Sequence, residues 1–198
     1  MKVNWPERIW VNSPLRKYIQ QKEAMFFRRS RTLPQGAICL EIGCGCGVGA
    51  KIINKTFSPS LVHAIDIDPE MLNLARRKQT TWHLQPLQLI AGDAQNLPYR
   101  DECFDAVFNY GIVHHLEDWQ QGIREVARVL KSGGSFYFEE IYPPLYGNII
   151  FRYILKHPRE NRFHGPEFRT YLDKCSLRLL PGFKESRFAI LGVAVKEK

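Results

Sequence analysis

The 198-residue sequence has no long apolar run and no internal repeat. No stretch approaches the roughly 18 consecutive apolar residues of a membrane-spanning helix, and residues 1–6 lack the apolar segment of a secretory signal. No repeat with a period of about 20–50 residues is present, which excludes solenoids and propellers. We therefore expect neither a transmembrane segment nor a secreted or repetitive protein.

The sequence also lacks a cysteine framework. Its number of cysteines is odd, no CxxC or zinc-type Cys/His spacing occurs, and the close pair lies inside a run of glycines. This pattern predicts small buried thiols in a reducing compartment, so we expect a cytoplasmic protein without a metal site. The cysteines are Cys39, Cys44, Cys46, Cys103 and Cys175.

The composition is typical of a soluble domain, but the charge is unevenly spread. Apolar residues make up 44% and charged residues 24%, which argues against disorder and suits one domain over residues 1–198. The net charge is +8, yet residues 37–144 hold nine basic and thirteen acidic residues. The basic excess therefore lies in the flanking segments, where a partner, a substrate or solvation must account for it.

Short apolar runs alternate with helical patterns through the middle of the chain. Turn and capping signals separate them, such as Asp68-Pro69 and Asp118 at two expected helix starts. The alternation predicts an open parallel sheet with helices on both faces, whose ligands bind beyond the carboxyl ends of the strands. The expected strands are 37–42, 61–67, 87–90, 104–108 and 135–139, and the first two expected helices are 48–57 and 69–78.

The first of these strands runs into a glycine-rich loop at residues 41–49. Glycine lets a ligand approach the main chain closely, and the helix that follows offers unpaired N–H groups. Gly45, Gly47 and Ala50 satisfy the GxGxxG/A spacing of a dinucleotide-binding fold, with Asp66 as the ribose-binding acid. A nicotinamide-dependent oxidoreductase is therefore one alternative.

Three acids near the strand ends favour a different ligand. Glu41 stands two residues before the first glycine, Asp66 ends the second strand and Asp93 follows the third. They would repel a pyrophosphate, whereas a ligand with an ammonium and a sulfonium would be attracted. Asp93 is also placed to accept a hydrogen bond from an adenine amino group.

Six short motifs occur in a fixed order over residues 37–144. They are 41–47 (ExGxGxG), 65–72 (IDIDPEML), 92–98 (GDAxxLP), 104–107 (FDxV), 114–118 (HHLxD) and 130–134 (LKSGG). The series resembles class I S-adenosylmethionine-dependent methyltransferases, in particular the type 11 branch that contains quinone-biosynthesis enzymes. Ser132 departs from the family's usual proline. The resemblance implies an α/β, Rossmann-like, doubly wound and mostly parallel sheet of seven strands, the last of them antiparallel.

The resemblance also implies S-adenosylmethionine as the cofactor and assigns residues to it. Because the donor is already activated, methyl transfer is an in-line displacement that needs positioning and desolvation, with a base only if the acceptor must lose a proton. The implied contacts are Glu41 and Asn109 at the amino-acid end, Gly43, Gly45 and Gly47 beneath the methionine and ribose, Asp66 at the ribose hydroxyls, and Ile67, Asp93 and Ala94 around the adenine.

No catalytic residue is identified from the sequence, but five side chains are weak candidates. His114 and His115 follow the fourth expected strand, where a packing or cofactor-contact role is the alternative. Glu139, Glu140 and Tyr142 end the fifth strand, and alternation along a strand predicts that the two glutamates point to opposite faces.

The flanking segments are expected to cover the cleft. Residues 1–35 form an N-terminal helical cap, with a helix that Ser13-Pro14 opens, and residues 36–144 form the cofactor-binding core. Residues 145–181 form a helical substrate lid, with helices over 145–156 and 166–180. Residues 182–198 hold the final strand pair, near 183–188 and 191–196.

The basic flanks favour a small-molecule or lipid-like acceptor that is anionic or borne by a membrane. An RNA methyltransferase is an alternative, yet Asn109-Tyr110-Gly111 stands where amino-group methyltransferases of bases carry Asn/Asp-Pro-Pro-Tyr, so nucleic acid is not favoured. A catalytically silent cofactor-binding module is the other alternative. The oligomeric state and the chemical type of the methylated atom are not predicted.

Overall fold

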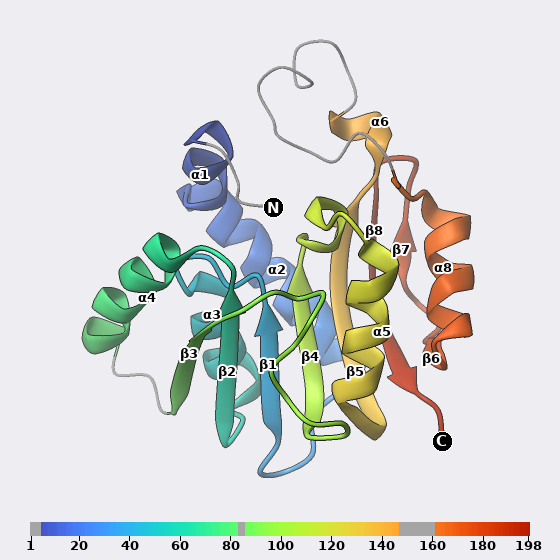
Figure 1. The fold of residues 1–198 in the computed structure, drawn as a ribbon, viewed down its shortest axis with the longest axis horizontal. Coiled ribbons are helices and arrows are strands. Elements are labelled where there is room, and N and C mark those ends of the chain that lie inside the picture. Colours follow the sequence, from blue (N-terminus) through green and yellow to red (C-terminus); the bar gives the residue numbers. More distant parts are fainter. Residues whose placement is uncertain (1–4, 83–85, 147–160) are drawn as a thin grey trace.

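The structure is a computed structural model that describes residues 5–82, 86–146 and 161–198 (Figure 1). Its helices are α1 (Trp5–Val11), α2 (Pro14–Ser30), α3 (Val48–Phe57), α4 (Pro69–Trp82), the 3₁₀ helix η1 (Val113–His115), α5 (Trp119–Val129), α6 (Pro143–Tyr146) and α8 (Gly165–Lys174). Its strands are β1 (Ile38–Ile42), β2 (Leu61–Asp66), β3 (Leu87–Ala91), β4 (Phe104–Tyr110), β5 (Leu130–Ile141), β6 (Leu177–Leu179), β7 (Lys184–Glu185) and β8 (Ala189–Lys196).

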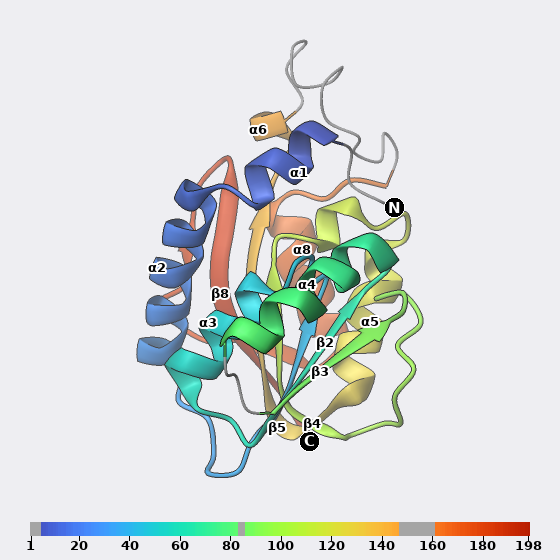
Figure 2. The ribbon, with the colours of Figure 1, turned by 90° about the vertical axis from the view of Figure 1, so that its left-hand side faces the viewer.

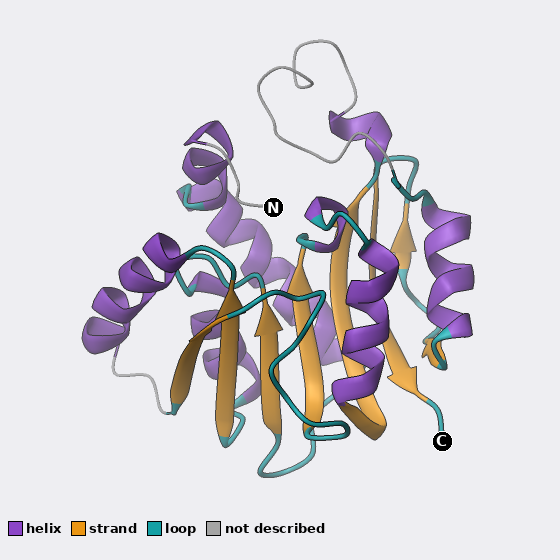
Figure 3. Cartoon of the chain, viewed as in Figure 1, coloured by secondary structure: helices purple, strands orange, loops and turns teal. Residues whose placement is uncertain are grey.

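These strands form one sheet in the order β3-β2-β1-β4-β5-β8-β6, with β7 also paired to β8 (Figure 3). The first five strands run parallel, whereas β8 is antiparallel to β5. The expected doubly wound, mostly parallel sheet with an antiparallel last strand is confirmed. The chain reverses its winding between the neighbours β1 and β4, and ligands bind beside such a switch point.

The sheet has eight strands that occupy seven positions, because β6 and β7 lie along the same edge of β8. β6 pairs with residues 194–196 of β8 and β7 with residues 190–191. Gly182, which has a φ of +88°, lies in the turn between them. The predicted strand over 183–188 is therefore reduced to a two-residue pairing.

The prediction of a helix over 166–180 is wrong at its carboxyl end. α8 ends at Lys174, and Ser176 adopts a φ of +56°, which stops the helix. Leu177 is then fully buried while Arg178 is exposed. This alternation suits the edge strand β6 better than a further helical turn.

Two apolar layers enclose the sheet. Helices α2, α3 and α4 cover one face, and α5 and α8 cover the other (Figures 1 and 2). Phe168 and Leu172 of α8 are fully buried beside Trp119 of α5, so this part of the expected lid belongs to the core. The expected helix over 145–156 lies mostly outside the described residues, and a lid function for 145–181 stays a prediction.

The N-terminal helices lie at the carboxyl ends of the parallel strands. Ser13 caps α2 as expected, its hydroxyl accepting a hydrogen bond from the Arg16 N–H, whereas the preceding helix α1 is not predicted by the sequence. Figure 2 shows α1 above the sheet, with α2 descending along one face. This placement makes both helices walls of the space at the switch point.

Candidate functional site

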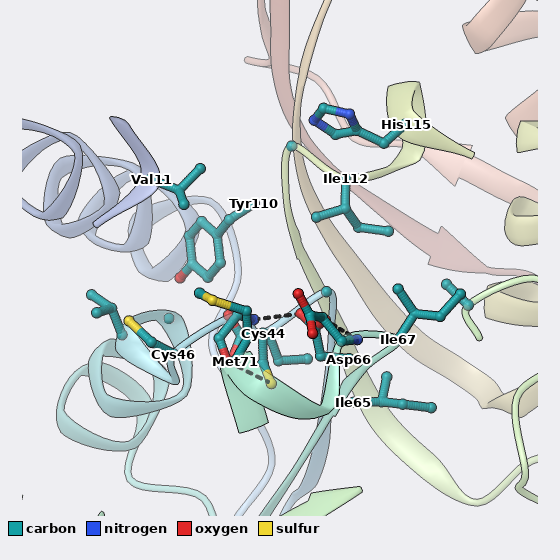
Figure 4. A pocket seen from close by; sticks show the side chains of 18 of the residues that line it. Val11, Cys44, Cys46, Ile65, Asp66, Ile67, Met71, Tyr110, Ile112 and His115 are labelled. Atoms are coloured by element: carbon teal, nitrogen blue, oxygen red, sulfur yellow. Dashed lines mark hydrogen bonds between the residues drawn. The ribbon is translucent and has the colours of Figure 1, made fainter. Parts of the chain in front are cut away.

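A cavity lies at the carboxyl ends of β1, β2 and β4, where the parallel topology predicts a ligand site (Figure 4). The N-terminal helices supply one wall of it, and the glycine loop and the turns after β2, β3 and β4 supply the others. Residues that line it include Val11, Asn12, Arg16, Gln20, Glu41, Gly43, Cys44, Gly45, Asp66, Ile67, Met71, Asp93, Ala94, Tyr110, Gly111, Ile112 and His115.

Two of the residues expected at the cofactor are not among those that line this cavity. Gly47 begins α3 with a φ of +80°, and a Cβ there would lie 3.3 Å from the Ala75 Cβ. Its role in the structure is thus the turn into α3 and the packing of α3 against α4. Asn109 is fully buried behind the cavity and bonds to neighbouring protein groups.

Glu41 is a buried carboxyl group with an unused acceptor. The residue is 2% exposed, and its side chain packs so closely on Gly49 that a Cβ there would lie 2.8 Å from the Glu41 Cδ. Glu41 Oε2 has no hydrogen-bond partner among the described residues. Burial raises the pKa of this carboxyl well above its usual range. A cationic ligand group beside Oε2 would supply the missing partner.

Asp66, at the end of β2, faces the glycine loop. Its carboxylate accepts hydrogen bonds from the Gly45 N–H at 2.7 Å and from the Asp68 N–H at 2.8 Å. Burial raises the pKa of Asp66, and the two backbone donors oppose that rise. Ile67 follows with 42% of its surface exposed at the cavity, which leaves an apolar side chain beside the acid.

The turn after β3 holds Asp93 in a fixed orientation. Asp93 Oδ1 accepts a hydrogen bond from the Gln95 N–H at 2.9 Å, and the Asn96 N–H donates to the Asp93 carbonyl at 3.0 Å. Asp93 and the neighbouring Ala94 both line the cavity.

The N-terminal helix α2 brings a buried cation to the cavity. The Arg16 guanidinium donates to Glu23 Oε1 at 2.7 Å, to the Tyr110 carbonyl at 3.1 Å and to Glu139 Oε2 at 3.1 Å. This cluster is not predicted by the sequence. The signal that could have found it is the spacing of Arg16, Gln20 and Glu23, which puts polar side chains on one helical face.

Glu140 is the centre of a buried network behind the cavity. Its carboxylate accepts from Asn109 Nδ2 at 2.5 Å and from the Val113 N–H at 2.8 Å, and it lies 2.6 Å from His114 Nδ1. These contacts fix η1, which follows the cavity-lining residues Gly111 and Ile112. Asn109 therefore has a structural role in this network, and its expected contact with the cofactor stays a prediction.

The structure brings one of the five catalytic candidates to the cavity wall. His115 lines the cavity, whereas His114 and Glu140 are buried in the network just described. Glu139 pairs with Arg16, and the Tyr142 hydroxyl donates to Glu185 at 2.9 Å, away from the cavity lining. The two glutamates do point to different partners, as strand alternation predicts.

A family model described as a methyltransferase domain matches residues 40–138. The chain belongs to this family. The type 11 resemblance is confirmed, and S-adenosylmethionine is the cofactor of the domain. The finer resemblance to quinone-biosynthesis enzymes is not specifically supported and stays a prediction.

Curated relatives match the same part of this methyltransferase. A fatty-acid O-methyltransferase of Mycolicibacterium smegmatis is 37% identical over 109 residues, which are 55% of this chain and 39% of the relative. A probable phthiotriol/phenolphthiotriol dimycocerosates methyltransferase of Mycobacterium ulcerans is 35% identical over 108 residues, 54% of this chain and 41% of the relative. The match thus spans about two fifths of the length of these relatives.

Solved structures support the fold over nearly the whole chain. A SAM-dependent methyltransferase from Aquifex aeolicus superposes with a TM-score of 0.75 and 19% sequence identity. The match covers 96% of this chain and 98% of that chain. The flanking elements around the family domain are therefore part of a common arrangement of this methyltransferase fold.

The cavity of this methyltransferase suits its cofactor. Glu41 offers an unpartnered buried carboxyl oxygen to an ammonium, and Asp66 offers a carboxylate beside the glycine loop. Gly43 has a φ of +68°, and a Cβ there would lie 2.8 Å from Ile112 Cγ1, so a larger residue would crowd the cavity wall. The residues present therefore fit a ligand with a cationic amino-acid end and a ribose.

Proposed function

We propose that this chain catalyses S-adenosylmethionine-dependent methyl transfer to a lipid-like acceptor. The observation that carries the proposal is the cavity at the switch point, where the buried Glu41 and the strand-end acid Asp66 lie against a glycine loop. When bound, the cofactor supplies a methyl group on an activated sulfonium. The protein's part is to bind, orient and shield the reacting groups.

The cofactor-binding roles follow from the positions along the cavity. Glu41 Oε2 holds the amino group, because a buried unpaired carboxyl oxygen gains most from a cationic partner. Asp66 accepts hydrogen bonds from the ribose hydroxyls on the acceptor sites that its two backbone donors leave open. Gly43 and Gly45 let the main chain approach the ligand. Ile67 and Ala94 pack around the adenine. Asp93 accepts a hydrogen bond from the adenine amino group.

His115 is the candidate that remains for moving a proton from the acceptor. It lines the cavity together with Ile112 and Leu116, so the acceptor side of the wall combines one imidazole with apolar side chains. A carboxylate acceptor would need no base, since its oxygen is already a nucleophile, whereas a hydroxyl acceptor would need one. Acceptor type and the need for His115 are therefore linked.

The relatives support the lipid-like class of acceptor. One is named for fatty acids and another for phthiotriol and phenolphthiotriol dimycocerosates. The basic flanks of this chain fit an anionic member of that class, such as a fatty carboxylate. In the part of the chain that the structure describes, no helix is long and apolar enough to cross a membrane. We also propose a cytoplasmic location, in keeping with five free cysteines.

A thermal-shift comparison of S-adenosylhomocysteine, S-adenosylmethionine and NAD tests the cofactor. A ligand at 100 times its Kd stabilises a protein by about 2.7 kcal/mol, which is roughly 5–10 °C for a chain of this length. We expect both adenosyl ligands to raise the Tm and NAD to leave it unchanged. A shift with NAD alone would make the protein an oxidoreductase instead.

The acceptor is tested by transfer of a labelled methyl group from S-adenosylmethionine. Long-chain fatty acids, long-chain diols, short-chain acids and transfer RNA are compared as acceptors. Label in the organic extract with long-chain acceptors alone supports the proposal. Transfer to RNA would support the nucleic-acid alternative, and tight binding of S-adenosylhomocysteine without transfer to any acceptor would indicate a silent module.

A further inference from the structure

Helix α2 has an unusual distribution of polarity. Its inward face carries the buried charged residues Arg16 and Glu23 beside the buried apolar residues Ala24 and Phe27. Its outward face carries Leu15 and Tyr18, each 56% exposed, and Met25, 49% exposed. An amphipathic helix of a soluble protein normally places such apolar side chains against the core. The outward face of α2 therefore presents apolar side chains that the described residues leave exposed.

The outward apolar residues of α2 form a stripe together with two cations. Leu15, Tyr18, Lys22, Met25 and Arg29 follow one another at spacings of three and four, which puts them on one side of the helix. Lys22 Nζ lies 5.2 Å from the centre of the Tyr18 ring. Apolar and basic side chains thus share one surface instead of segregating to opposite faces.

Helix α1 adds two exposed apolar side chains near the mouth of the cavity. Ile9 is 63% exposed and Trp10 is 48% exposed, and the next two residues, Val11 and Asn12, line the cavity. Figure 2 shows α1 and α6 at the same end of the molecule, beyond the carboxyl ends of the strands. We call Ile9, Trp10, Leu15, Tyr18 and Met25 the α1–α2 patch.

The exposed charges of α2 are of one sign. Glu23 is the single acidic residue of α2, and it is buried against Arg16. The basic residues Lys22, Arg28 and Arg29 of the helix are all exposed. A surface of aliphatic and aromatic side chains with lysine and arginine between them fits the interface of a bilayer that contains anionic lipids.

We infer that the α1–α2 patch docks this protein on anionic lipid surfaces, with the mouth of the cavity beside the membrane. Trp10 and Tyr18 enter the headgroup layer, where amphipathic aromatic rings are favoured. Lys22 and Arg29 approach the anionic headgroups while their aliphatic stems lie along the apolar surface. This inference concerns binding to a surface and does not depend on which molecule accepts the methyl group.

Co-sedimentation of the full chain with lipid vesicles tests the inference. Vesicles of phosphatidylcholine alone are compared with vesicles of phosphatidylcholine mixed with phosphatidylglycerol, at low and at high salt. We expect binding to the anionic vesicles that is roughly tenfold or more tighter than to neutral ones, and that high salt weakens. Equal binding to both kinds of vesicle, or no binding to either, would overturn the inference.

Paired variants separate the patch from the rest of the molecule. Leu15→Ser with Tyr18→Ser removes apolar area, and Lys22→Glu with Arg29→Glu reverses charge. Each pair is expected to weaken binding to anionic vesicles by roughly tenfold or more. Leu74→Ser and Arg77→Glu on α4 are the matched controls, because both residues are exposed and lie outside the patch. An equal loss in the controls contradicts the inference.

Two further measurements make the vesicle result decisive. The thermal shift caused by S-adenosylhomocysteine reports that each variant is folded and that its cavity is intact. A variant that keeps this shift and loses vesicle binding supports docking, whether or not methyl transfer is ever observed.

Light scattering of the free protein tests whether the α1–α2 patch instead binds a second copy of this chain. A wild-type dimer that Leu15→Ser with Tyr18→Ser converts to a monomer would show that the patch binds a second copy, and it would overturn the inference.

Discussion

The Arg16 guanidinium donates a 3.1 Å hydrogen bond to the Glu139 carboxylate, although 123 positions separate the two residues. Arg16 belongs to the N-terminal helix α2 and Glu139 to β5, so this bond joins the N-terminal helix to the sheet beside the cavity. Arg16 also pairs with Glu23, so two buried carboxyl groups share a single cation. The helix is therefore held by buried charges that respond to pH.

The Glu23 carboxyl should make stability depend on pH. Burial, with the nearby charge of Glu139, raises the pKa of Glu23 from 4.5 to about 7 in the folded protein. The folded state binds this proton more tightly, so the stabilisation is present below pH 4.5 and is lost as the pH rises through about 7. Glu23→Gln removes this titration. Between pH 4.5 and about 7, we expect the free energy of unfolding of the wild type to fall by about 2 kcal/mol more than that of the variant.

Urea denaturation of both proteins at a series of pH values measures this difference. The comparison is needed because burial also raises the pKa of Glu41, Asp66 and Glu139, and those groups titrate in the variant as well. Parallel stability curves for the two proteins between pH 4.5 and 7 would show that Glu23 does not titrate there.

Asp66→Ala should abolish tight cofactor binding without unfolding the protein. The change removes a carboxylate that would accept two ribose hydroxyls, and such charge-assisted bonds contribute about 1.5–3 kcal/mol each. A loss of affinity of about 100-fold or more follows. The N–H groups that lose their acceptor belong to Gly45 and Asp68, which line the cavity, and water can replace the carboxylate there.

Titration calorimetry with S-adenosylhomocysteine measures the loss for Asp66→Ala. Asp101→Ala is a suitable control, because the Asp101 side chain is 72% exposed and pairs with Arg128. Wild-type affinity in the Asp66 variant would refute the role of the β2 end in binding the ribose.

Gly43→Ala and Gly133→Ala separate backbone strain from crowding of the cavity. Both glycines have positive φ, +68° for Gly43 and +78° for Gly133, so each alanine costs about 1 kcal/mol in the left-handed region. A Cβ at Gly133 meets nothing within 4 Å, whereas one at Gly43 would lie 2.8 Å from Ile112 Cγ1. Gly43→Ala should therefore lower the free energy of unfolding by at least about 1 kcal/mol more than Gly133→Ala does.

The measurement for this glycine pair is urea denaturation together with calorimetry of S-adenosylhomocysteine. Because Ile112 lines the cavity, Gly43→Ala should also weaken cofactor binding, while Gly133→Ala should not. Equal stability losses and unchanged affinities would show that Ile112 moves aside freely.

The sequence predicts the cofactor-binding core well because its signals are local. β1, expected over 37–42, spans Ile38–Ile42, and α3 spans Val48–Phe57 as expected. Buried parallel strands read as short apolar runs, and glycine and capping residues mark their ends. Since the carboxyl ends of parallel strands meet, the order of motifs was enough to bring Glu41, Asp66 and Asp93 to one cavity.

The sequence fails where a residue's role depends on a distant partner. Asn109 stands at a strand end, and the sequence does not predict that its amide bonds to Glu140, which lies 31 positions away. The pairing of Arg16 with Glu139 is missed for the same reason. The sequence does not predict β6, because Leu177 and Leu179 continue the apolar pattern of α8. Their extended conformation results from pairing with β8.

Glu140→Gln should destabilise the protein through the loop that forms one wall of the cavity. The wild-type carboxylate offers two oxygens to donors from Asn109, Val113 and His114. Glutamine keeps one oxygen and turns an NH₂ group toward the remaining donors, which leaves buried N–H groups without an acceptor. We expect a loss of about 2–4 kcal/mol in the free energy of unfolding.

Glu117→Gln is the matched control for Glu140→Gln, because Glu117 lies two residues after η1 and is exposed. It should change stability by less than about 0.5 kcal/mol. Cofactor affinity adds a second test, since η1 follows Gly111 and Ile112 in the cavity wall. If Glu140→Gln keeps wild-type stability but loses methyl transfer, the residue acts in the chemistry and the structural role assigned to it here is wrong. If stability and affinity fall together while bound enzyme turns over normally, Glu140 acts by holding the loop in place.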